Sequence, residues 1–414
     1  MRISRRNFLG LSAATGGGAA LGALGWSMRG EATSDDRTQP ASARRIPFGG
    51  FHQSGVTTPQ QESLVFAAFD VRAERLDDVR TLFLEWTDAA RRMTGGEPIR
   101  ARQGGFSDAP PDSGETQGLD PSRLTLTFGF GPDFFGTRSD ARFGLARLRP
   151  PSLVSLPPFA GDQLDQARVG GDLCVQACAD DPQVAFHAIR NLAALGRGAV
   201  VVRWMQQGFR HIRAPVPLTG RNLLGFKDGI NNLDPSDDEQ MAANVWAGEE
   251  GPAWLRGGTY MVVRRIRMRV EHWDSVSLSE QERTFGRKKV TGAPFGANRE
   301  HDPVDPRSLP PDCHIIQANP RTAGSESERI LRRSYSFADG LDARFGELDA
   351  GLFFVCFQRD PRRQFVAIQT RLSRGDHLRE YVFHTGSGIF AIPPGTRERG
   401  YVGQPLLEGD VTMQ

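Results

Sequence analysis

The sequence of 414 residues has few cysteines, little excess charge and no long apolar run. Its four cysteines, Cys174, Cys178, Cys313 and Cys356, have no framework spacing, which argues against a fold held by disulfide bonds. The 51 basic and 49 acidic residues nearly cancel, so the strong positive field typical of a nucleic-acid-binding protein is lacking. These absences indicate an ordinary apolar core and a small-molecule site rather than a nucleic-acid partner.

The first 43 residues are predicted to be an export signal. Ser4–Gly10, S-R-R-N-F-L-G, has a twin-arginine pattern and precedes a Gly/Ala-rich, weakly apolar stretch. Gly16–Gly18 interrupt that stretch and make it a poor membrane span, although an uncleaved anchor is the alternative. Ala41–Ala43 is similar to a signal cleavage site. We therefore expect a mature chain that starts near Arg44 and is periplasmic or extracellular.

The first half of the mature chain alternates strand and helix patterns. Leu64–Val71 predicts a buried strand, and apolar residues on one helical face between Leu76 and Met93 predict a helix. Leu124–Phe130 alternates Leu and Thr and predicts a half-buried strand. Residues 172–190 predict a third strand and a second helix, with Cys174 and Cys178 packed in the strand. Ala199–Met205 predicts a fourth strand.

The second half repeats this pattern. Residues 172–190 align without gaps with residues 351–369, and Asp181-Pro182 meets Asp360-Pro361. In each copy a strand ends at an aspartate placed to cap the next helix, with proline in the first turn. Strands are also predicted at Gly258–Val270 and Gly388–Pro393, with a helix containing Gln281 and Phe285.

Each half thus has the order β-α-β-β-α-β, which predicts an α+β protein made of two ferredoxin-like domains by internal duplication. We expect two antiparallel sheets, each covered by helices on one face. The expected domains are residues 44–216 and residues 217–414, with the seam near residues 212–220.

Four motifs of the second half occur in a characteristic order. They are R-N-L-L-G-F-K-D-G at 221–229, T-G-A-P-F-G at 291–296, H-I-I-Q-A-N-P-R at 314–321 and I-L-R-R-S-Y-S-F at 330–337. Together they resemble the dye-decolourising peroxidase family, and within it the exported deferrochelatase/peroxidase branch associated with bacterial iron uptake. The resemblance is densest from about residue 217 to the C-terminus.

This resemblance implies a haem b peroxidase. Such an enzyme reduces hydrogen peroxide and oxidises aromatic or dye-like donors via an iron-oxo intermediate. The chain has no C-x-x-C-H, so haem is expected to be bound non-covalently, mainly by the C-terminal domain. Two alternatives stay open: a deferrochelatase that releases iron and leaves the porphyrin intact, and a haem-binding or delivery protein without activity. The resemblance also implies two possible kinds of protein partner, which are components of an iron-uptake system and further copies of this chain in a homo-oligomer.

Three residues match the family's catalytic positions. His314 matches the axial ligand of the haem iron. Asp228 matches the acid/base group on the opposite face, and Arg332 matches the cation that stabilises charge on the departing oxygen. Neighbouring side chains of an extended segment point to opposite faces, so we expect Arg333 on the outside or near a propionate. Without the other motifs, Asp228 would be an ordinary turn residue and Arg332 a solvated strand residue.

Further residues match family positions around the haem. They are Gly229, Ile230 and Asn231 beside Asp228, and Asn319, Pro320 and Arg321 after His314. Arg321 is placed to pair with a propionate. Ile230-Asn231-Asn232 departs from the usual family residues, so this loop is expected to differ in shape. Asp376 aligns with an acidic position that holds the second ring nitrogen of the ligand, and helix capping before His377 is its alternative role.

Overall fold

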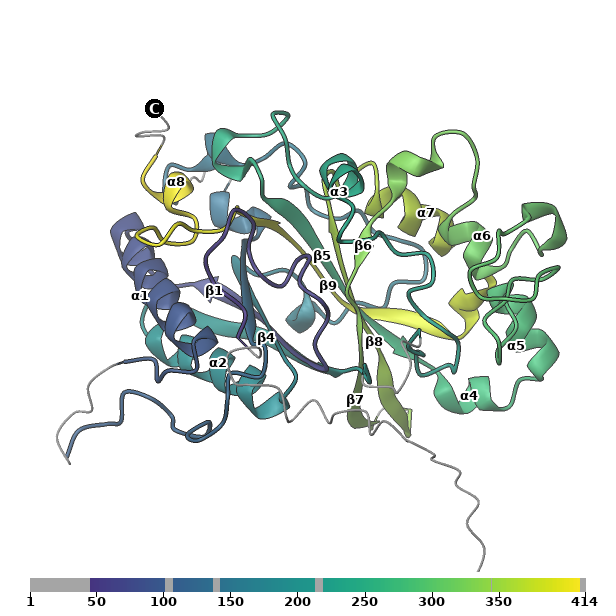
Figure 1. Cartoon of the computed structure of the whole chain (residues 1–414), viewed down its shortest axis with the longest axis horizontal. Coiled ribbons are helices and arrows are strands. Elements are labelled where there is room, and N and C mark those ends of the chain that lie inside the picture. Colours follow the sequence, from purple (N-terminus) through teal and green to yellow (C-terminus); the bar gives the residue numbers. More distant parts are fainter. Residues whose placement is uncertain (1–44, 101–106, 137–141, 213–218, 344, 410–414) are drawn as a thin grey trace, which may run out of the picture. The chain divides into compact units, whose positions relative to one another are not determined.

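Figure 1 shows the computed structural model, which describes residues 45–409 except 101–106, 137–141, 213–218 and 344. The described strands are β1 Ser63–Val71, β2 Thr125–Phe130, β3 Leu173–Ala179, β4 Val200–Phe209, β5 Thr259–Met268, β6 Leu331–Arg332, β7 Tyr335–Asp342, β8 Glu347–Gln358 and β9 Val382–Ile392. The helices are α1 Leu76–Thr94, α2 Pro182–Leu195, α3 Asp238–Asn244, α4 Val270–Asp274, α5 Leu278–Phe285, α6 His314–Ala318, α7 Phe365–Gly375 and α8 Gln404–Leu407. Short 3₁₀ segments connect them. Among the described helices, none has the length and apolar character needed to span a membrane.

The predicted α+β class is confirmed, but the strands form one sheet rather than two separate ones. Their order is β5-β9-β2-β3-β1-β4-β7-β8-β6, and β5 also pairs with β8, so the sheet closes on itself. Two single pairs, Phe130 with Ala391 and Phe209 with Ser336, join the strands of the two halves. Closure pairs strand edges that two separate sheets would have left open.

Strand β1 is buried on both faces because its side chains alternate between two cores. Val65, Ala67 and Phe69 pack with α1 and α2, whereas Leu64 and Phe66 lie in a second core cluster inside the closed sheet. Figure 1 shows α1 and α2 on one side of the strands and α5, α6 and α7 on the other. The site described below lies on the side of α6 and α7.

Strand β2 was predicted to be half-buried, and that prediction is wrong. Thr125 and Thr127 are fully buried because polar partners inside the closed sheet satisfy their hydroxyl groups. Thr127 donates to the carbonyl of Ser54 at 2.7 Å, and the amide of Gln61 donates to the hydroxyl of Thr125 at 3.1 Å. The alternation of leucine and threonine therefore gives β2 one apolar and one polar face, and both faces are buried.

The two copies of the aspartate-proline motif differ in structure. Asp181 caps α2 as predicted, because its carboxylate accepts from the backbone N–H of Gln183 at 2.7 Å. Asp360 does not cap α7, which begins only at Phe365. The side chain of Gln364 accepts from the N–H of Asp360 and donates to the carbonyl of Asn244, which holds residues 361–364 in a turn.

The four cysteines are buried and unpaired, and Cys174 and Cys178 lie in β3 as predicted. The predicted seam falls partly on residues 213–218, which lie outside the described residues.

A buried arginine on β5 ties the two halves together. Arg265 is almost fully buried and donates to Gln206 of β4, Thr385 of β9, and Asp339 and Asp349 of β7 and β8, at 2.7 to 2.9 Å. A buried cation is stable only when such partners replace its water.

We predict that Arg265→Leu lowers the free energy of unfolding by about 3–5 kcal/mol, because it leaves two carboxylates without their cation. Urea denaturation of the haem-free chain measures this change. Arg307→Leu is the control, since Arg307 and its partner Asp305 are exposed, and its effect should stay within about 0.5 kcal/mol. Equal urea midpoints for Arg265→Leu and the unaltered chain would contradict the role of Arg265.

Candidate active site

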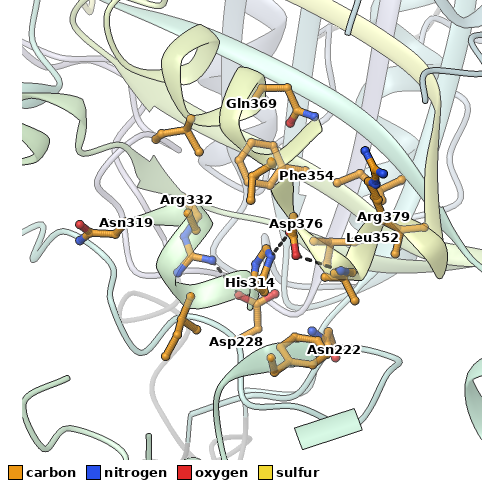
Figure 2. Close-up of a pocket in the computed structure, with 18 of the residues that line it drawn as sticks. Asn222, Asp228, His314, Asn319, Arg332, Leu352, Phe354, Gln369, Asp376 and Arg379 are labelled. Carbon is orange, nitrogen blue, oxygen red and sulfur yellow. Dashed lines mark hydrogen bonds and ion pairs between the residues drawn. The ribbon is translucent and has the colours of Figure 1, made fainter. Parts of the chain in front are cut away.

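A cavity of about 470 Å³ lies between the outer face of β5, β8 and β9, the helices α6 and α7, and the loop at 222–231. This volume is within the range of cofactor and small-molecule pockets. Figure 2 shows some of its lining side chains. Leu352 and Phe354 of β8 supply apolar surface, and His314, Asp228, Arg332 and Asp376 supply polar groups.

His314 is the first residue of α6, and a buried carboxylate holds its ring. Its Nδ1 lies 2.6 Å from Oδ2 of Asp376, a contact drawn as a dashed line in Figure 2. Asp376 is only 4% exposed, and its other oxygen accepts from the N–H of Leu378 at 2.9 Å. Both roles considered for Asp376 therefore occur together. Because Nδ1 donates to the carboxylate, Nε2 keeps the lone pair that a metal needs.

Two opposing effects act on the pKa of His314. Burial lowers the pKa of the imidazole, whereas the carboxylate of Asp376 raises it, and Asp228 adds a smaller increase. The net result is a pKa above the ordinary value of histidine. Asp376 thus makes the imidazole more basic, and therefore a stronger electron donor to a metal.

Asp228 and Arg332 form an ion pair on the same cavity. Nη1 of Arg332 donates to Oδ1 of Asp228 at 2.9 Å, and both side chains remain partly exposed. Gly225 and Gly229 flank Asp228 with φ of 83° and 112°, a conformation that favours glycine. The loop thereby turns the carboxylate towards Arg332.

Asn232 positions Arg332, and sequence reasoning missed this role. Its Oδ1 accepts from the N–H of Arg332, and its Nδ2 donates to the carbonyl of Arg332, both at 2.9 Å. The two residues are a hundred positions apart, so no local pattern indicated the contact. Asn232 belongs to the stretch that departs from the usual family residues.

Arg333 points away from the cavity, as the alternation of the extended segment predicted. The expectation that it lies outside or near a propionate is wrong, because it is 5% exposed and buried against the first half of the chain. It donates to the carbonyl of Thr58 and to the side chain of Gln61.

The other predicted residues divide into two groups. Gly229, Ile230, Asn231, Asn319 and Arg321 line the cavity. Pro320 is not among the lining residues. Arg321 has φ of 56°, and its guanidinium donates to the carbonyls of Ile315 and Asn319 at the end of α6. It therefore also caps the short helix that carries His314.

Arg287 is a further lining residue that sequence reasoning missed. It donates to the carbonyls of Gly292 and Glu300. Burial lowers the pKa of Arg287, and the nearby guanidinium of Arg321 lowers it further, to about 10. Arg287 is buried and Arg321 half-buried, and two neighbouring cations favour an anionic group at this end of the cavity.

A second cavity, of about 320 Å³, reaches the same ion pair from another side. Asp228, Gly229 and Arg332 line both cavities. The remaining walls of the small cavity are mostly polar and come from Gln60, Arg210, Thr219, Gly220 and Asn232.

Comparison with known proteins identifies the family. Residues 53–210 match the model of the Dyp-type peroxidase N-terminal domain, and residues 219–397 match that of the C-terminal domain. The chain belongs to the Dyp-type peroxidase family. It is 41% identical over 381 residues to the deferrochelatase of Escherichia coli, covering 89% of this chain and 88% of that protein.

Solved structures agree with this assignment. The DyP-type peroxidase of Streptomyces coelicolor superposes with a TM-score of 0.82 and 40% identity, over 90% of this chain and 100% of that one. Ferric DtpA of Streptomyces lividans gives 0.81 and 39%, over 90% and 100%. A heme complex of a DypB variant of Rhodococcus jostii, at 21% identity, TM-score 0.61 and coverage of 83% and 98%, shares the fold.

The protein is a haem-dependent peroxidase, and the cavity suits haem. Haem would be held by a ring nitrogen of His314 at the iron, by apolar contact of Leu352 and Phe354 with the flat macrocycle, and by the positive charge of Arg287 and Arg321 at its carboxylates.

We predict that Asp376→Asn weakens haem binding by about 10–100-fold, because the ring of His314 loses its carboxylate partner. Titration of the haem-free chain with haemin, followed by absorbance, measures the affinity. Glu380→Gln is the matched control, since Glu380 lines the same cavity and its carboxylate lies near His377.

The same titration tests the pKa of His314. Protonation of the imidazole competes with iron, so haem binding should weaken as the pH falls through the raised pKa. Asp376→Asn removes the main group that raises the pKa, so its loss of binding should begin at lower pH. If the unaltered chain and Asp376→Asn lose haem binding over the same pH range, Asp376 does not raise the pKa of His314.

Proposed function

We propose that the chain is an exported haem b peroxidase in which His314 holds the iron and Asp228 and Arg332 act on peroxide at the opposite face. The supporting observation is that the His314–Asp376 contact and the Asp228–Arg332 contact open onto one cavity. When bound, haem supplies the redox chemistry that couples reduction of peroxide to oxidation of a donor.

Asp228 is assigned the proton transfer. Its Oδ1 is bonded to Arg332, which leaves the second carboxylate oxygen to take a proton from one peroxide oxygen and return it to the other. Arg332 is assigned the stabilisation of negative charge on the departing oxygen. Because its guanidinium is already fixed in place, it does not have to reorient during the reaction. The two backbone contacts with Asn232 keep Arg332 in place for this role.

We assign the small cavity to the approach of hydrogen peroxide. Its mostly polar walls suit a small polar molecule, and it reaches Asp228 without crossing the larger cavity that the macrocycle would fill. Aromatic or dye-like compounds are the proposed donors.

A haem carrier without activity would use His314 and the apolar walls, but it would have no need for the Asp228–Arg332 pair. That pair therefore favours the peroxidase over the carrier. Deferrochelation is the second proposed activity, because the 41% identical relatives are named deferrochelatases.

We infer a duplication into residues 44–216 and 217–414, which strand order supports. Leaving out the short strand β6, each half has four strands, and their order across the sheet is second, third, first, fourth in both halves. This order is β2-β3-β1-β4 in the first half and β7-β8-β5-β9 in the second.

Export through the twin-arginine pattern is proposed from the sequence of residues 1–43, which lie outside the described residues. Cell fractionation of the full chain tests it. Binding to iron-uptake components and association with further copies of the chain stay predictions.

Asp228→Asn should slow the reaction with peroxide by about 10²–10⁴-fold, because no carboxylate moves the proton. Arg332→Leu should slow it by about 10²–10³-fold through loss of the charge. Stopped-flow absorbance of the haem-loaded proteins measures the rate. Asp234→Asn, an exposed carboxylate farther along the same loop, is the control. Unchanged rates in both variants would refute the assigned roles.

Deferrochelation predicts that haem-loaded protein releases iron and yields intact protoporphyrin. Chromatography of the extracted pigment, with an iron chelator in the buffer, distinguishes the outcomes. Ring-opened products or unchanged haem would leave peroxidase activity as the function and exclude deferrochelation.

A further inference from the structure

A buried tyrosine and a buried thiol meet inside the closed sheet, on the other side of β8 from the haem cavity. Tyr335 and Cys178 both have 0% exposure and belong to the same core cluster. Among the described residues, the hydroxyl of Tyr335 has no partner in good hydrogen-bond geometry. The thiol of Cys178, the side chain of Gln60 and the guanidinium of Arg333 are the polar groups that act on it, and Arg333 acts on the thiol as well.

The backbone brings Tyr335 to this position. Cys178 of β3 is paired with Leu64 of β1, which is paired with Gly208 of β4, so the three residues form a row across the sheet. Tyr335 lies against the end of this row, since a Cβ on Gly208 would come within 2.6 Å of the Cβ of Tyr335. Glycine at 208 thus gives the tyrosine ring room to reach towards Cys178.

This pair is close to the site of peroxide chemistry. Tyr335 is paired with Phe353 of β8, and the neighbours Leu352 and Phe354 line the haem cavity on the opposite face of the strand. Gln60 acts on the Tyr335 hydroxyl and also lines the small cavity that contains Asp228. An electron lost from Tyr335 has one layer of sheet to cross, and its proton can leave through the small cavity.

Core packing alone does not account for the hydroxyl. Buried tyrosine hydroxyls usually find a hydrogen-bond partner, and phenylalanine would fill the same volume without a polar atom. Burial raises the pKa of both groups, so phenol and thiol keep their protons until oxidation removes them.

We propose that Tyr335 and Cys178 are an internal oxidation site that becomes cross-linked when peroxide is turned over without an external donor. This rests on the proposed function, which supplies the oxidant. Two electrons and two protons leave the pair, and one hydrogen peroxide becomes two water molecules. The S–H bond of Cys178 and a ring C–H bond beside the Tyr335 hydroxyl break, and a C–S bond forms.

The experiment treats the haem-loaded full chain with equimolar hydrogen peroxide in the absence of donor. Tryptic peptides are then analysed by mass spectrometry after reduction and alkylation. The expected product is a peptide pair joining Cys178 to Tyr335, lighter than the two peptides by two hydrogen atoms and resistant to thiols. Alkylation of Cys178 should be lost to the same extent.

Matched variants keep the test interpretable. Tyr335→Phe and Cys178→Ala should abolish the linked peptide, whereas Cys174→Ala, a buried thiol of the same strand, should retain it. Excess aromatic donor should suppress the link, and haem-free protein should not form it.

If the haem spectrum responds to peroxide but Cys178 remains fully alkylatable, or is oxidised without a link, the inference is wrong while the proposed function stands. A link formed without haem also overturns it. If the haem spectrum does not respond at all, the proposed function fails, and this inference fails with it.

Discussion

The contact between His314 and Asp376 is the constraint on which the site depends. One carboxylate oxygen fixes the imidazole, and the other fixes the start of the turn that follows α7. Because α6 has only five residues, it cannot orient His314 by its own stability. Orientation comes instead from Asp376 on one side and from the guanidinium of Arg321 at the end of α6. His314 is thus held by one contact with a distant segment, that of Asp376, and by one local contact, that of Arg321.

The closed sheet forms the other wall of the site. Strand β8 presents Leu352 and Phe354 to the haem cavity and Phe353 to the interior core. Arg332 on β6 and Asp228 on its glycine-flanked loop then meet at the border between a large cavity and a small polar one. The same alternation that separates Arg332 from Arg333 separates the haem site from Tyr335 and Cys178.

That Asp228, His314 and Arg332 share one cavity was predictable because each lies in one of the motifs that together resemble the family. Asp228 lies in a glycine-flanked loop, His314 opens a polar stretch, and Arg332 stands in an extended run. Asn232 and Arg287 were missed, since their roles arise from backbone contacts that no local pattern encodes. The burial of Arg333 was missed for the same reason.

The fold shows a similar limit. The long strands and the helices α1 and α2 were predicted from the sequence pattern, whereas the short helices α3, α4, α6 and α8 were not. Closure of the sheet depends on two single strand pairs between distant segments. The late start of α7 depends on one side chain, Gln364, which no propensity identifies. The sequence predicted that only one face of β2 is buried, but both faces are. Threonine is counted as a polar, exposed residue even where its hydroxyl is hydrogen-bonded in the interior, as it is at Thr127.

A crystal structure of the haem-loaded chain tests this arrangement most directly. We expect iron bound to Nε2 of His314, with Asp228 and Arg332 together on the opposite face of the macrocycle. Iron bound by any other side chain, or Asp228 and Arg332 on the same face as His314, would contradict it.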